Sequence, residues 1–389
     1  MDDAEVHAVY YFLLGLSYTE ILAMLSFCHG FHLSLSTLKR KLNCLGLYRK
    51  KHFSELHLVV NFIEQQLQSS GQLHGYRWMH LKCIQHGLTV TREAVRMIIN
   101  ELDPIGVTFR TRKRLRRRKY STRGPNFVWH VDSYDKLKPY GIAINGAIDG
   151  FSRHIMWLKA GRTASDPKVI GGYFLEAIEK YGGCPRRLRS DLGTENRYME
   201  QFQIFFRTLP ADNTDVCYGD RSFLYGTSQA NQRIESWWSI LRKQNAQFWM
   251  NIFQSLKEDG YFSGTYLDKS LIRFCFMAII QKELAQVELE WNTHRIAASR
   301  NSISPKGRPI VLFELPQAYY TQTYICQVTH HDLNICKQES SFLYLPCDVH
   351  VYQLCKLIMR EKNLREPSDS YEAVNLYLTL REEIMSQIL

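Results

Sequence analysis

Three acidic side chains stand where they could hold divalent metal ions. Asp132 follows the β-rich run Phe127–Val131, Asp191 follows the short run Arg187–Ser190, and Glu235 lies in a segment with helical periodicity. Carboxylates at strand ends and on a neighbouring helix can converge, and converging like charges need a compensating cation. Oxygen-only ligands favour Mg²⁺ or Mn²⁺ over zinc. Two such ions about 4 Å apart can activate an attacking hydroxyl and stabilise the leaving oxygen of a phosphodiester.

Taken singly, each of these residues is more typical of a turn or of a solvent-facing helix position. The elements around them decide whether they can meet. The apolar pattern predicts strands at 127–132, 142–148, 155–158, 187–190 and 216–218. It predicts helices at 169–181, 198–208, 230–249 and 260–296, and a last helix from about Ser370. This order is typical of an α/β layered domain with a mixed sheet.

Two helical units precede the strands. In the first, residues 1–52, Ser17 and Glu20 form a capping box, and Ser34 or Ser36 caps a basic third helix. That helix carries Lys39, Arg40 and Lys41. The layout is typical of a helix-turn-helix that reads the major groove, and also of a three-helix bundle used for protein contacts. In the second unit, residues 53–107, Thr91 caps a helix that exposes Arg92 and Arg96.

A basic linker, residues 108–125, joins these units to the strands. Residues 1–124 hold 19 Lys and Arg against 9 Asp and Glu, so nearly all of the net charge of +11 lies in the first third of the chain. The linker's arginines that we expect to contact DNA phosphates are Arg112, Arg114, Arg116, Arg117 and Arg118. Phosphate contact with counterion release is one interpretation of this run; a nuclear-import signal or a solvated tether are the others.

Several segments resemble, in order, the core motifs of retroviral-type integrases and DDE transposases. They are Trp129–Asp132, Ile148–Arg153, Ser190–Asn196 and Asn231–Glu235, followed by a closing segment at Trp291–Arg295, Ser304–Pro305 and Gly307–Pro309. The match is close to animal integrase core domain proteins. Residues 11–50 are similar to the helix-turn-helix of those proteins, and Gly75–Arg77 with Val90–Glu93 looks like the second helical unit of many insertion-sequence transposases.

The resemblance implies a ribonuclease H-like α/β fold, with a mixed five-stranded sheet and flanking helices, preceded by all-helical helix-turn-helix units. By position it makes Asp132, Asp191 and Glu235 the catalytic, metal-binding triad, with Mg²⁺ or Mn²⁺ in a two-metal site. Asn231 and Gln232, one turn earlier, are expected to contact DNA. Two departures stand out: the 43 residues between Asp191 and Glu235 require an insertion near 209–226 to be absorbed, and no zinc module precedes the core. Both fit a transposase ancestry better than a retroviral one.

The sequence therefore predicts a DNA-binding, transposon-derived integrase- or transposase-like protein with a catalytic core at 126–310 and a region without assignable role at 311–389. The alternative is a domesticated, catalytically silent DNA-binding or scaffold protein. We expect DNA as partner, a homo-oligomer, and no small-molecule cofactor. The acidic N-terminus, the lack of a run of about 18 apolar residues and the scattered cysteines predict an intracellular, reducing, nuclear location and no membrane.

Overall fold

The computed structural model describes residues 2–69, 71, 74–104, 106–107, 121–226, 231–297, 305–342 and 345–388. Contacts divide the chain into two units. The helical unit comprises Met1–Pro125, Gly150–His154 and Leu289–Thr323, and the sheet unit comprises Asn126–Asp149, Ile155–Glu288 and Tyr324–Leu389. The domain boundaries expected from the sequence, among them 126–310 for the core, remain predictions.

The helical unit begins with three short helices. They are α1 (Asp3–Leu13), α2 (Tyr18–His29) and α3 (Leu35–Cys44). The predicted capping box is present, because the Ser17 side chain accepts from the Glu20 amide and the Glu20 side chain accepts from the Ser17 amide. Ser34, the first of the two candidates, caps α3. Apolar side chains of all three helices share one core, which includes Leu16, Leu25 and Leu38.

A second group of helices follows in the same unit. It contains α4 (Leu56–Leu67), α5 (Tyr76–Gln85) and α6 (Arg92–Leu102), with Thr91 capping α6 as predicted. Its core is separate and is built from Val59, Ile63, Met79, Val95 and Ile99, among others.

The closing segment of the predicted catalytic core packs within this helical unit. Arg308 lies 2.9 Å from Glu20 and donates to the Gly15 carbonyl at 2.7 Å. Val311 of α13 (Pro309–Glu314) and Leu315, which directly follows this helix, join the core of the first three helices. The sequence pattern does not reveal these contacts, because they join residues nearly 300 positions apart.

The sheet unit is built on a five-stranded mixed sheet with the order β3-β2-β1-β5-β6. The strands are β1 (Val128–Tyr134), β2 (Ala143–Asp149), β3 (Ile155–Gly161), β5 (Arg187–Ser190) and β6 (Phe223–Tyr225). β1, β2 and β3 pair antiparallel, whereas β5 pairs parallel to β1 and to β6. The predicted fold class is confirmed: a mixed five-stranded sheet with flanking helices follows an all-helical region in the chain. Two details were wrong: Asp132 lies inside β1 rather than at its end, and the last strand is β6 rather than residues 216–218.

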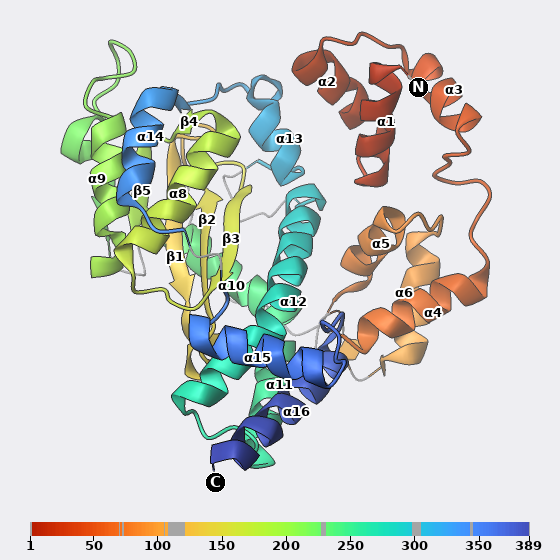
Figure 1. Ribbon diagram of the computed structural model, residues 1–389. Helices are drawn as coiled ribbons and strands as arrows, with labels where there is room; N and C mark the ends of the chain where they lie inside the picture. Colours follow the sequence, from red (N-terminus) through yellow and green to blue (C-terminus); the bar gives the residue numbers. More distant parts are fainter. Residues whose placement is uncertain are drawn as a thin grey trace. The chain divides into compact units, whose positions relative to one another are not determined.

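Helices cover both faces of this sheet (Figure 1). The helices of the sheet unit, in chain order, are α8 (Pro167–Tyr181), α9 (Arg197–Phe206), α10 (Gln232–Leu241), α11 (Gln247–Glu258), α12 (Tyr266–Thr293), α14 (His330–Glu339), α15 (Val349–Glu361) and α16 (Ser370–Ile388). Residues Arg242–Ala246 form a π-helical turn between α10 and α11. α12 passes from the sheet unit into the helical unit after Glu288. None of the helices in the described ranges has the length and apolar character that crossing a membrane requires.

The two faces of β1 carry different side chains because successive residues of a strand point to opposite sides. Trp129 packs at ring-centroid distances of 6.3 Å and 6.1 Å against Phe174 and Tyr181 of α8. Tyr134 packs on the other face, 5.5 Å from the ring of Trp238 in α10. Asp132, two residues before Tyr134, therefore points to the α10 side of the sheet.

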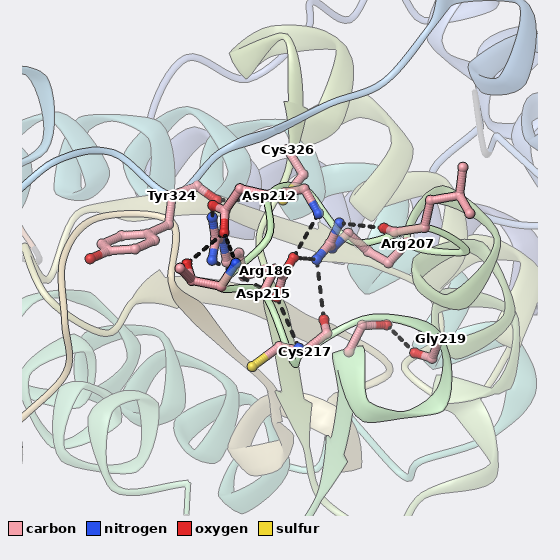
Figure 2. A network of polar contacts seen from close by, with 12 residues as sticks. Arg186, Arg207, Asp212, Asp215, Cys217, Gly219, Tyr324 and Cys326 are labelled. Atoms are coloured by element: carbon pink, nitrogen blue, oxygen red, sulfur yellow. Dashed lines mark hydrogen bonds and ion pairs between the residues drawn. The ribbon is translucent and has the colours of Figure 1, made fainter.

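The expected insertion between α9 and β6 is organised by buried ion pairs (Figure 2). Arg207 pairs with Asp215, and the two side chains are 2% and 0% exposed. Asp215 also accepts from the amides of Ala211 and Cys217, both at 2.9 Å. Burial opposes ionisation of Asp215, but these hydrogen bonds and Arg207 outweigh it and lower its pKa. The segment therefore folds around one carboxylate.

We predict that Asp215→Ala strongly destabilises the protein, because it leaves the Arg207 guanidinium buried without its partner. Breaking a buried pair in this way costs about 3–5 kcal/mol. Asp212→Ala is the matched control, since Asp212 pairs with the neighbouring Arg186 but its side chain is 43% exposed. Denaturant unfolding should show a much smaller loss for the control; equal losses would contradict the assigned role of Asp215.

Candidate active site

The three predicted carboxylates lie on the α10 side of the sheet unit. Asp132 is on β1, and Asp191 directly follows Ser190, the last residue of β5. β1 and β5 are parallel neighbours with Trp129 opposite Leu188 and His130 opposite Arg189. Continuing this register by two residues brings Asp191 beside Asp132. Glu235 lies in the first turn of α10 and is exposed.

One buried amide fixes α10 against β1. The Asn231 Nδ2 donates to the Val131 carbonyl at 2.8 Å, and the Asn231 Oδ1 lies 2.7 Å from the Nδ1 of His130. Because the carbonyl can only accept, the amide oxygen must face the ring, and His130 Nδ1 carries the proton. Asn231 is 1% exposed and His130 0% exposed. The side chain that we expected to contact DNA is instead used to hold the helix on the strand.

His130 is neutral in this position. Burial, together with the nearby charges of Arg189 and Arg233, lowers its pKa to about 3 against the opposing effect of the hydrogen bond to Asn231. A neutral imidazole can share a buried hydrogen bond with an amide without the cost of a buried charge.

Trp238 makes the second link between α10 and β1. Its indole Nε1 donates to Asp132 Oδ2 at 2.8 Å, while Asp132 Oδ1 accepts from the Ser133 amide at 2.8 Å. Trp238 is three residues after Glu235, so the two side chains lie on one face of the helix. Opposite Asp132, β2 has Gly146, where a Cβ would lie 3.0 Å from Cη2 of Trp238. The glycine therefore leaves room for the indole that orients Asp132.

Asp191 is oriented by its own loop. Asn196, which is 4% exposed, donates to Asp191 Oδ1 at 3.2 Å and lies 3.4 Å from the Asp191 carbonyl. Ser190 Oγ also donates to that carbonyl at 3.0 Å. The residues on either side of Asp191 in the motif Ser190–Asn196 thus hold the loop that follows β5.

The three carboxylates repel one another. Burial raises the pKa of Asp132 to about 7, and the charges of Glu235 and Asp191 raise it too, against the hydrogen bonds from Trp238 and Ser133. Burial and the charge of Asp191 raise the pKa of Glu235. The charges of Glu235 and Asp191 thus act on Asp132, and the charge of Asp191 acts on Glu235.

The donor set fits Mg²⁺ or Mn²⁺, since all three groups offer carboxylate oxygens. In the described part of the chain, no group of three or more His, Cys, Asp or Glu side chains is close enough as it stands to hold a metal ion. Mg²⁺ does not need such a cage, because it usually binds one or two protein carboxylates and completes its shell with water and phosphate oxygens. Asp149, a fourth acidic residue nearby in sequence, is buried and accepts from the Asn126 amide at 2.7 Å, which is a structural role.

The other residues predicted to bind DNA differ in their surroundings. Lys39 and Arg40 are exposed on α3, whereas Lys41 lies 2.7 Å from both Asp2 and Glu5. Arg92 and Arg96 are exposed on α6, and Arg96 pairs with Glu93 at 2.5 Å.

Gln232, the first residue of α10, is half-buried. The basic run of the linker, Arg112, Arg114, Arg116, Arg117 and Arg118, lies outside the described residues. Sequence reasoning missed the parts played by His130 and Trp238, although His130 lies within the motif Trp129–Asp132 and Trp238 lies three residues after Glu235. Helical spacing from Glu235 is the one signal that points to Trp238.

The protein's stability should show the repulsion among the carboxylates. Because the pKa of Asp132 is raised above its ordinary value of 3.8 to about 7, its contribution to stability is present at low pH and is lost as the pH rises through 7. We predict that Glu235→Gln melts roughly 1–3 °C above the wild type at pH 8, and that this advantage shrinks toward pH 5.

Comparing the two proteins at each pH removes the contributions of other titrating groups. Glu258→Gln on α11, an exposed glutamate of the same unit, should give no such difference. A constant offset between wild type and Glu235→Gln from pH 5 to pH 8 would show that the carboxylates do not interact.

Residues 119–307 match the family model of the integrase core domain. No curated protein matches the chain. The mixed five-stranded sheet, with β1 central and α10 beside it, agrees with the ribonuclease H-like fold that the sequence motifs imply.

Proposed function

We propose that this protein, whose residues 119–307 match the integrase core domain, cleaves and joins DNA strands with the triad Asp132, Asp191 and Glu235. One observation carries the proposal. Asn231 and Trp238 fasten α10 to β1, which carries Asp132 and is the parallel neighbour of β5, the strand that Asp191 directly follows; Glu235 lies in the first turn of the helix held in this way. This arrangement supports a shared site for residues from three distant parts of the sequence.

Each part of the site has a separate task in this proposal. Trp238 and the Ser133 amide hold the Asp132 carboxylate in one orientation, and Asn196 holds that of Asp191. Glu235, at the exposed start of α10, can reach a phosphate that lies near Asp132 and Asp191. The positive end of the α10 dipole also favours a phosphate there.

Asp132, Asp191 and Glu235 would hold Mg²⁺ or Mn²⁺. Such ions activate an attacking hydroxyl and stabilise the oxygen that leaves the phosphorus. The chain's own contribution is to present three carboxylates at fixed positions, two on the rigid sheet and one on a helix that is docked to it. We further propose that the substrate is nuclear DNA and that strand transfer uses more than one copy of the chain.

The helical unit supports DNA binding. Its first three helices expose Lys39 and Arg40 on α3, the helix that the helix-turn-helix layout places in the major groove. Lys41 has a different role, because its ion pairs with Asp2 and Glu5 hold α3 to the start of α1.

A second candidate is a catalytically silent DNA-binding or scaffold protein. It is favoured by the hydrogen bonds that already occupy both oxygens of Asp132 and by the raised pKa of that carboxyl, which weakens it as a cation ligand. In that case the site would persist as a packing unit, with Asp132 helping to fix α10.

We predict that purified protein with Mn²⁺ joins a labelled DNA end to a target duplex, and that Asp191→Asn and Glu235→Gln each lower the yield by roughly 100-fold or more. Glu258→Gln is the control and should keep full activity. Mn²⁺ should raise the melting temperature of the wild type but not that of Asp191→Asn, because a ligand that binds only the folded state stabilises it.

Equal product from the wild type and the triad variants would refute the proposed catalytic role of the triad. Absence of product from the wild type, together with intact DNA binding and no Mn²⁺ stabilisation, would support the silent protein.

For DNA binding, we predict that Lys39→Ala and Arg40→Ala each weaken the affinity for duplex DNA and reduce the slope of log K against log salt by about 0.9. Lys41→Ala lies on the same helix and serves as the comparison. Because Lys41 is ion-paired, its loss should lower the melting temperature while leaving the salt slope unchanged. An unaltered slope in the first two variants would exclude α3 from the DNA contact.

A further inference from the structure

Two cysteines face each other on a small sheet outside the carboxylate site. β4 (Gly183–Cys184) and β7 (Cys326–Gln327) pair antiparallel, with Cys184 directly opposite Cys326. We call these two residues the thiol pair. The strand β4 comes three residues before β5, and β7 begins the last part of the chain, which contains α14, α15 and α16.

The backbone already sets the spacing that a disulfide needs. Residues directly opposite in an antiparallel pair have Cα atoms about 4.5–5.5 Å apart, and disulfides span Cα distances of about 4.4–6.8 Å. The Cys326 thiol donates to the Tyr324 carbonyl at 3.6 Å. A Cβ on Gly183 would lie 2.4 Å from the Cys326 carbonyl oxygen, so the two strands approach closely here. A bond between the sulfur atoms therefore requires little movement of the backbone.

The surroundings give the two thiols different reactivity. Cys326 lies beside the buried arginines of the ion-pair network, and Figure 2 shows it with Arg186, Arg207 and Tyr324. The neighbouring Cys184 thiol lowers the pKa of Cys326, and the charges of Arg207 and Arg186 lower it too, against the effect of burial. Burial raises the pKa of Cys184. Cys326 is 5% exposed and Cys184 0% exposed, so Cys326 is also the thiol that a small oxidant reaches first.

We propose that Cys184 and Cys326 form a reversible disulfide when the protein meets a hydroperoxide. The Cys326 thiol loses its proton and its sulfur attacks the peroxide; an S–O bond forms and the O–O bond breaks. The leaving hydroxide or alkoxide takes up that proton, so the products are a sulfenic acid on Cys326 and water or an alcohol. The Cys184 sulfur then attacks the Cys326 sulfur. The S–S bond forms, the S–O bond breaks, and the hydroxide that leaves takes the Cys184 proton to give water. A thiol such as glutathione reverses the oxidation.

The bond would fasten the last part of the chain to the sheet unit. In the reduced protein, β7 is held to β4 by a ladder of two residues on each side. The disulfide closes a long loop from residue 184 to 326, and long closed loops restrict the unfolded chain most. It also fixes the segment that leads into β5 and thereby to Asp191. The inference does not depend on the proposed DNA chemistry.

The test is to treat the full-length reduced protein with hydrogen peroxide, block the remaining thiols with N-ethylmaleimide and map the disulfides by mass spectrometry of non-reduced peptides. We expect a peptide linked through Cys184 and Cys326, the loss of two hydrogen atoms from the intact mass, and reversal by dithiothreitol. The oxidised protein should melt roughly 4–10 °C above the reduced protein.

Cys184→Ser and Cys326→Ser should each abolish both the linked peptide and the rise in melting temperature. Cys217→Ser, another buried cysteine next to the same ion-pair network, is the matched control and should retain both. The proposal is wrong if wild-type protein that has consumed peroxide still carries maleimide on Cys184 and Cys326, or if its disulfides join other cysteines. This result is read on the wild type alone and stands even if a serine variant fails to fold.

Discussion

The hydrogen bonds of the Asn231 amide are the constraint on which the candidate site depends. A buried amide must satisfy both its oxygen and its nitrogen, and here the partners are the His130 ring and the Val131 carbonyl. Moving α10 by one residue along its axis would break both hydrogen bonds, and each polar group left buried without a partner costs about 1–3 kcal/mol. The position of the helix is therefore fixed, and with it the positions of Glu235 and Trp238.

The two faces of β1 have different roles, one in core packing and one in the candidate site. On one face, Trp129 packs with α8 in an aromatic cluster, and on the other, His130 and Asp132 meet α10. Because the side-chain period of a strand is two, this division follows from the register alone. Gly146 completes it, since the indole that holds Asp132 occupies the space above that residue. The same packing that buries apolar surface thus presents a carboxylate in a fixed orientation.

The inserted segment and the last part of the chain meet at a second buried polar cluster. Arg207 and Asp215 organise the segment before β6, and Arg186 pairs with Asp215 at 3.8 Å while lying 5.1 Å from the centre of the Tyr324 ring. Buried charges contribute specificity when every partner is present, because any other arrangement leaves one unpaired. This cluster explains how the long gap between Asp191 and Glu235 is accommodated without disturbing the sheet, and it also gives the thiol pair its charged neighbours.

The sequence by itself determined what depends on local order: the Ser17 and Thr91 caps, the periodicity of the helices, most strands, and the succession of motifs that indicates an integrase core. Tertiary structure decided what depends on partners far away in the chain. Asn231 carries no local sign that it bonds to residues about a hundred positions earlier, and the same holds for Trp238 and Asp132. The strand expected at 216–218 does not form for the same reason, because the amide of Cys217 donates to the Asp215 side chain instead of to a neighbouring strand. Periodicity reports which side of an element is buried, whereas only the folded chain determines what each buried polar group meets.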